Sequence, residues 1–83
     1  MFSPMTMDIL AVAQLRADLR SGRAREIRKR AQLSLAEVAR ELGTDPSAVW
    51  GWESGRRTPR GQNADKYADL LWQLDKLTRE GAT

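Results

Sequence analysis

Three closely spaced arginines, Arg56, Arg57 and Arg60, are the side chains of this sequence best suited to binding chemistry. A guanidinium stays charged at neutral pH and offers a planar set of N–H donors, which suits it to phosphate groups. The three arginines follow Gly55, at the end of a segment, 34–59, whose pattern is that of two short helices joined by a turn. This arrangement indicates either a phosphate-binding loop or a solvated charged loop.

Few other kinds of chemistry are open to this chain. Its 83 residues include no cysteine and no histidine, which excludes disulfides, thiolate metal sites, the commonest general base and the commonest metal ligand. The acidic residues fall at helix starts or on polar faces, and the glycines match none of the Gly-rich motifs that bind nucleotide phosphates in enzymes. We therefore expect no enzymatic activity, no metal, no cofactor and no small-molecule substrate.

The sequence pattern predicts an all-α protein with a single compact bundle of about five helices. Helix-forming residues dominate, and no region alternates apolar and polar residues as a strand would. No apolar run approaches the ~20 residues that a membrane span needs, and the N-terminus lacks the pattern of a secretory signal. We expect a cytoplasmic protein whose small core benefits from an oligomer partner.

Capping signals predict the ends of both helices in the central motif, residues 34–55. Ser34 precedes Glu37 by three residues, the spacing of a capping box. Gly43 suits a left-handed C-cap, and Pro46 suits the first position of the second helix, where its missing N–H costs nothing. The residues expected in the core, including two from a later helix, are Val38, Ala39, Leu42, Val49, Trp52, Leu70 and Leu74.

Three more helices are expected around the motif, all within one domain of residues 6–80. The first covers residues 7–20, the second residues 23–31, and the last residues 63–79 with Asn63 as its N-cap. The expected apolar stripe of the first helix comprises Ile9, Val12, Ala13 and Leu19. Residues 1–5 show no periodicity and are expected to be disordered.

Positive charge is concentrated in the middle of the chain. Residues 16–60 hold eleven Lys/Arg and six Asp/Glu, a net charge of +5, whereas the remaining residues have a net charge of −2. Five of these cations crowd the second helix: Arg23, Arg25, Arg28, Lys29 and Arg30. An anionic partner would relieve their repulsion, so the pattern indicates a polyanion-binding face or, alternatively, a solvated helix surface.

The central motif resembles the helix-turn-helix of the lambda-repressor/Cro-like (Xre-type) DNA-binding proteins over about residues 23–74. The resemblance lies in IRKRAQLS, in the alanine and glycine of EVARELG, and in VWGWESGRRTP. Ala39 and Gly43 permit a close crossing of two helices, which Val49 and Trp52 hold together. The resemblance implies a bacterial or phage-encoded protein that binds double-stranded DNA.

The same resemblance implies a recognition helix at residues 46–54. Its groove-facing residues would be Pro46, Ser47, Trp50, Gly51 and Ser54, a set poorer in hydrogen-bonding side chains than is usual for this family. Gly51 would let the helix backbone approach DNA closely. Trp50 would lie against a thymine methyl or a sugar or, alternatively, pack on Arg57 or a partner subunit. Phosphate contacts are expected from Arg56, Arg57, Arg60, Thr44 and Ser34.

Two further charged residues match a pair that joins helices in some relatives. They are Arg28 in the second helix and Glu53 at the end of the recognition helix. The resemblance therefore implies a structural salt bridge between them.

The resemblance favours a small transcriptional repressor that binds a near-palindromic operator as a homodimer. The dimer is expected from small size, family habit and Trp72, which falls on a different side of the last helix from Leu70 and Leu74. One alternative is an antitoxin-like autoregulator or a phage recombination-directionality factor, which would bind a protein partner through the N-terminal helix. Another is a helical adaptor that binds protein only.

Overall fold

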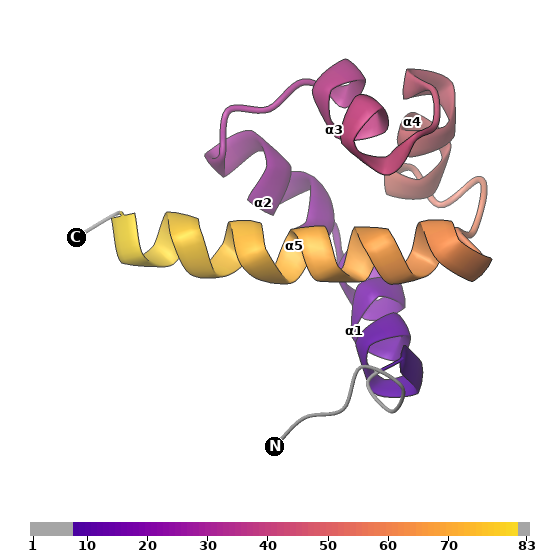
Figure 1. Ribbon diagram of the computed structural model, residues 1–83, viewed down its shortest axis with the longest axis horizontal. Helices are drawn as coiled ribbons and strands as arrows, with labels where there is room; N and C mark the ends of the chain where they lie inside the picture. Colours follow the sequence, from indigo (N-terminus) through magenta and orange to yellow (C-terminus); the bar gives the residue numbers. More distant parts are fainter. Residues whose placement is uncertain (1–7, 82–83) are drawn as a thin grey trace.

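The structure is a computed structural model that describes residues 8–81, and within these residues it has five helices and no strand. The helices are α1 (Asp8–Ser21), α2 (Arg23–Arg30), α3 (Leu35–Leu42), α4 (Pro46–Glu53) and α5 (Gly61–Gly81). α5 is the longest, and both α1 and α2 pack against it. Figure 1 shows α3 and α4 together on one side of α5, while α1 extends on the other side. The expected all-α fold is confirmed.

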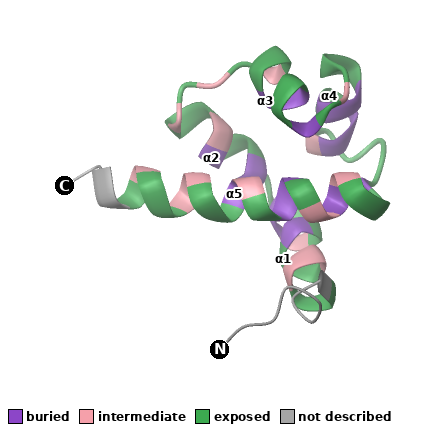
Figure 2. Ribbon diagram, in the orientation of Figure 1, coloured by how far each residue is buried: buried purple, intermediate pink, exposed green. Residues whose placement is uncertain are grey.

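One apolar core joins all five helices, and Figure 2 shows its buried residues along their inward faces. On α5 the buried residues follow the i, i+3, i+4, i+7 spacing of a single helix face: Ala64, Tyr67, Ala68 and Leu71. Five predicted core residues are buried: Val38, Ala39, Leu42, Val49 and Trp52. Leu70 and Leu74, predicted in the core, are only half-buried and pack against its edge.

Local hydrogen bonds define the α3–turn–α4 unit. The Ser34 hydroxyl accepts from the Glu37 N–H (3.0 Å), and the Glu37 carboxylate accepts from the Ser34 N–H (2.8 Å). Gly43 ends α3 with a φ of 74°, a left-handed conformation that glycine adopts without penalty. The Asp45 carboxylate then accepts from the Ala48 N–H (2.9 Å) at the start of α4. Caps of this kind are typically worth about 1 kcal/mol each.

Two sequence expectations about the outer helices are wrong in part. Of the stripe expected on α1, Leu19 is buried and Val12 packs against the core, but Ile9 is 76% exposed, and the innermost side chain is Leu15, outside the expected stripe. Apolar residues occur on several sides of α1, so only packing against the other helices selects the buried side. α5 begins at Gly61, before the expected cap at Asn63, because the Ala64 N–H already donates to the Arg60 carbonyl (3.4 Å).

Other helix boundaries differ slightly from expectation. Ser54, expected inside the recognition helix, is the C-cap of α4. The second helix ends at Arg30, and Ala31 caps it. The disorder expected for residues 1–5 lies outside the described residues.

Candidate nucleic-acid interface

α4 has one buried face and one exposed face. Ala48, Val49 and Trp52 are buried, and Val49 is 0% exposed. The Trp52 ring centroid lies 5.5 Å from that of Tyr67 on α5, a contact that helps to set which side of α4 turns outward. The outer face is formed by Pro46, Ser47, Trp50 and Ser54.

Gly51, predicted on this outer face, is buried beneath the side chain of Arg57. A Cβ placed on Gly51 would lie 2.8 Å from the Arg57 Cδ and 3.2 Å from its Cγ. The chain reverses after Gly55, whose φ is 80°, and the backbone N–H groups of Arg56 and Arg57 both donate to the Gly51 carbonyl (2.9 and 3.1 Å). The expectation that Gly51 exposes the helix backbone to DNA is therefore wrong, because Arg57 occupies that space.

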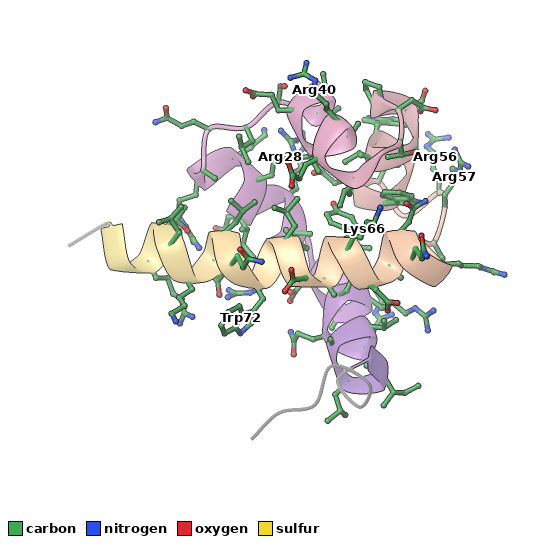
Figure 3. The ribbon with its side chains drawn as sticks, in the orientation of Figure 1. Arg28, Arg40, Arg56, Arg57, Lys66 and Trp72 are labelled. Atoms are coloured by element: carbon green, nitrogen blue, oxygen red, sulfur yellow. The ribbon has the colours of Figure 1, made fainter. Side chains whose placement is uncertain are left out.

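The arginine loop, residues 55–60, lies against the C-terminal end of α4. The Arg56 guanidinium carbon is 5.0 Å from the centroid of the Trp50 ring, within the range of a cation–π contact. Trp50 thus packs on Arg56, not on Arg57 as one alternative had it, and remains 48% exposed. Figure 3 shows Arg56 and Arg57 together beside α4, and Arg60 is also exposed, just before α5. Arg56 and Arg57 therefore lie against α4, whereas Arg60 lines a groove with Ile9 and Arg16 of α1.

A bidentate ion pair between Arg28 and Glu53 joins α2 to α4. Arg28 Nε donates to Glu53 Oε2 (2.6 Å), and Arg28 Nη2 donates to Glu53 Oε1 (2.9 Å). A third guanidinium N–H, on Nη1, donates to the Leu33 carbonyl (2.9 Å). The side chains are only 11% and 5% exposed, and hydrogen bonding to Glu53 raises the pKa of Arg28. The salt bridge implied by the family resemblance is therefore present in the structure.

A family model described as helix-turn-helix matches residues 25–71, more than half of the chain. The chain belongs to this helix-turn-helix family. The resemblance to lambda-repressor/Cro-like (Xre-type) proteins is thereby confirmed, and the protein is a DNA-binding regulator. Neither the curated proteins nor the solved structures contain a significant match.

Two hydroxyl side chains, those of Ser34 and Thr44, were predicted to bind DNA phosphates. Ser34 is the N-cap of α3, and Thr44 follows the C-cap of the same helix. Ser34 is exposed, but its hydroxyl oxygen is engaged by the Glu37 N–H. Hydrogen bonds from Ser34 lower the pKa of Glu37, so this carboxylate is charged at neutral pH and disfavours a phosphate nearby. Thr44 is half-buried in the turn between α3 and α4. Both positions are less favourable for a phosphate than the arginine loop.

Three of the five cations of α2 are paired with carboxylates of the same chain. Arg23 Nη2 and Arg30 Nη2 each lie 2.8 Å from a carboxylate oxygen of Asp75 on α5. Together with the Arg28–Glu53 pair, these contacts relieve the repulsion among the α2 cations. From the sequence, this relief was expected from an external anion. The expectation of an anionic partner is thus met intramolecularly for three of the five cations.

Several basic residues near the motif were not predicted as candidates. Arg16 and Arg20 of α1 line the same shallow groove as Arg57, and Arg40 is exposed on α3 (Figure 3). Arg16 and Arg20 are four residues apart, the spacing that puts two side chains on one face of a helix, and this was the available signal. Their closeness to Arg57 depends on how α1 packs, which the spacing does not reveal.

Within residues 8–81 the helix-turn-helix protein has no group of three or more acidic, cysteine or histidine residues suited to a metal ion. Among the described helices, none combines the length and the apolar character that crossing a membrane requires.

Proposed function

We propose that this protein is a sequence-specific transcriptional repressor that inserts the outer face of α4 into the major groove of DNA. The observation that supports this most strongly is the junction of that face with the arginine loop. Ser47 and Trp50 would contact base edges, with Pro46 and Ser54 beside them. The loop arginines would bind the flanking phosphates and fix the register of α4 on the duplex.

We further propose that the repressor binds a near-palindromic operator as a homodimer. Trp72 is 64% exposed and Leu77 is 65% exposed on α5. Figure 3 shows Trp72 on the side of α5 away from α3 and α4. A second copy bound over Trp72 would cover its exposed ring and leave the outer face of α4 free for DNA, whereas Leu77, five residues further on, lies on a different side of α5.

Selection of bound sites from a random double-stranded DNA library tests the DNA-binding proposal. Enrichment of one motif with two related half-sites is the expected result, and binding to it should weaken strongly between about 50 and 200 mM salt. A chain that binds no DNA at the lower salt concentration would instead be the protein-only adaptor. Enrichment of a single half-site without symmetry would contradict the homodimer.

Sedimentation equilibrium of wild type and Trp72→Glu tests the interface. Wild type should sediment as a dimer of the 9.4 kDa chain, and Trp72→Glu should shift it to the monomer with little change in folding, because Trp72 is exposed. Gln73→Glu, at the exposed neighbouring position, adds the same charge and should leave the dimer intact. A wild-type monomer at high micromolar concentration would refute the dimer.

A reporter gene distinguishes repression from activation. With the selected operator placed over a promoter, expression of the protein should lower reporter output, and Arg56→Ala/Arg57→Ala should restore it. An increase in output on expression of the wild type would identify an activator instead.

A second candidate function is supported by Ile9 and Leu10, each 76% exposed on α1. α1 begins before the residues that match the family model. An antitoxin-like regulator would use this apolar end of α1 to bind a partner protein. Co-expression with the product of the neighbouring gene should then yield a stable complex, which Leu10→Glu abolishes without affecting operator binding; Ile9 is left unchanged because it shares a groove with Arg60. Equal complex formation by this variant would exclude the α1 site.

A further inference from the structure

Two adjacent residues of α4 each contact one of two adjacent arginines in the loop. Trp50 lies under the guanidinium of Arg56, and Gly51 lies under the methylene stem of Arg57. The backbone N–H groups of both arginines also donate to the Gly51 carbonyl. Both arginines are therefore attached to the recognition helix, and neither projects from a free loop.

The close contact between Gly51 and Arg57 depends on the missing side chain. The three atoms nearest to a Cβ at position 51 all belong to Arg57, the closest at 2.8 Å, which real Cβ atoms essentially never tolerate. Glycine in the middle of a helix lowers helix stability relative to alanine, and nothing in the local helix geometry of α4 requires a glycine at position 51. The contact with Arg57 is the structural feature that explains why a glycine is present there.

We propose that Gly51 is a positioning residue for DNA binding, which holds Arg57 against α4 so that its guanidinium meets a backbone phosphate. This inference rests on the proposed binding of phosphate by Arg57. An arginine stem held in one conformation loses less side-chain entropy when its guanidinium binds, so the contact raises affinity by pre-organisation. Because the stem is flexible, an alanine at position 51 displaces Arg57 and leaves the fold intact.

A double-mutant cycle between positions 51 and 57 tests the proposal. The dissociation constant for the selected operator is measured by fluorescence anisotropy for wild type, Gly51→Ala, Arg57→Ala and the double variant. Gly51→Ala should weaken binding about threefold to tenfold and reduce the slope of log K against log salt by about 1, the signature of one lost phosphate contact. In the Arg57→Ala background, the same substitution should change neither quantity.

A second cycle with the neighbouring arginine is the matched control. None of the atoms nearest to a Cβ at position 51 belongs to Arg56, so Gly51→Ala and Arg56→Ala should have additive effects on affinity. Thermal unfolding should give Gly51→Ala a midpoint equal to or above that of wild type, since alanine favours the helix. A markedly lower midpoint would mean that Gly51 supports the fold, and would overturn the positioning role.

The outcomes separate this inference from the proposed function. If Arg57→Ala leaves affinity and salt slope unchanged, the phosphate role of Arg57 is wrong. If Arg57→Ala weakens binding but Gly51→Ala does not, the phosphate role stands and the positioning role of Gly51 is wrong. If Gly51→Ala weakens binding equally with and without Arg57, Gly51 acts on DNA directly.

Discussion

Two groups of arginines look alike in the sequence and have different surroundings in the structure. The first group, on α2, consists of Arg23, Arg28 and Arg30. Each of them has a carboxylate oxygen within 2.8 Å, supplied by Asp75 or Glu53. The second group, in the loop after α4, consists of Arg56, Arg57 and Arg60. Among the side chains that the structure describes, those of residues 9–79, no carboxylate lies within 4.0 Å of these three, and two of them lie against α4 through Trp50 and Gly51.

The difference shows that local charge density alone does not reveal which arginines are paired with carboxylates of the same chain. An arginine paired with a carboxylate is already partly neutralised, so it gains less from a phosphate than an arginine without such a partner. An arginine packed on an aromatic ring or on a glycine keeps its N–H donors available. The α2 group therefore stabilises the fold, whereas the loop group is the one that we propose for binding DNA.

The largest expected effect is the loss of the Arg28–Glu53 pair. Arg28→Ala leaves the Glu53 carboxylate, 5% exposed, without its partner, which should cost about 3–5 kcal/mol of unfolding free energy. Urea unfolding of Arg28→Ala, Glu53→Ala and the double variant measures both the loss and the coupling. A loss below about 1 kcal/mol, with no coupling, would mean that the pair is no more than a surface ion pair.

Two double variants that remove the same charge should affect DNA binding very differently. Arg56→Ala/Arg57→Ala should weaken operator binding about 10- to 100-fold and reduce the salt slope by about 2, because two phosphate contacts are lost. Arg23→Ala/Arg30→Ala should change the slope by less than about 0.5, since these side chains are paired with Asp75. Salt titrations by fluorescence anisotropy decide between them, and equal slopes would show that net charge alone matters.

Removing the carboxylate of Asp75, which Arg23 and Arg30 share, tests whether the paired arginines of α2 contribute to DNA binding once they lose that partner. Asp75→Asn keeps the shape of the side chain but removes the charged partner of Arg30 and leaves Arg23 only its longer contact with Asp18 (3.7 Å), and it should lower stability by about 1 kcal/mol. Operator affinity should stay within about twofold of wild type, because the freed arginines do not lie on the outer face of α4. Asp69→Asn, an exposed carboxylate of the same helix, serves as the control. A tenfold rise in affinity would show that released α2 cations reach DNA.

The smallest change in stability at neutral pH is expected for substitution of Tyr67. The charges of Arg28 and Glu53 both act on the pKa of its hydroxyl group. Its hydroxyl is buried without a hydrogen-bond partner among the described residues. Burial raises the pKa of Tyr67, and the charge of Glu53 raises it further. Tyr67→Phe should therefore change stability at pH 7 by less than about 1 kcal/mol, because it keeps the ring and removes an unsatisfied group.

The same shift in Tyr67 predicts a pH dependence with a definite sign. The folded state holds the phenol proton more tightly than the unfolded state, so this stabilisation is complete below the ordinary pKa of about 10 and is lost as pH rises above it. Urea midpoints should fall more steeply above about pH 10 in wild type than in Tyr67→Phe. Tyr67 is the only tyrosine, so phenolate absorbance should appear together with unfolding. Ionisation in the folded protein would contradict the burial argument.

Much of the fold could be predicted because its signals are local. The capping box at Ser34, the left-handed Gly43 and the first-turn Pro46 act over three or four residues, and all three are present in the structure. The spacing of apolar residues identified the buried side of α3 and α4. In α1, by contrast, apolar residues surround the helix, so the burial of Leu15 depends on neighbours distant in sequence.

The candidate site was predictable in its position and less so in its detail. The family resemblance implied that Ser47, Trp50 and Gly51 lie on the outer face of α4. Ser47 and Trp50 are exposed there, whereas Gly51 is buried against Arg57. Periodicity cannot show that the chain reverses after Gly55 and returns to cover the helix.

The sequence by itself thus determined the helices, their caps and the helix-turn-helix motif, since backbone hydrogen bonding and side-chain period depend on near neighbours. Only the tertiary structure decided which arginines remain available to a phosphate. That distinction depends on Asp75 and Glu53, carboxylates 25 to 52 residues away along the chain. It also depends on the return of Arg56 and Arg57 to α4. Coulombic pairing and packing depend on distances in space, so the order of charges along the chain does not determine which arginines are paired.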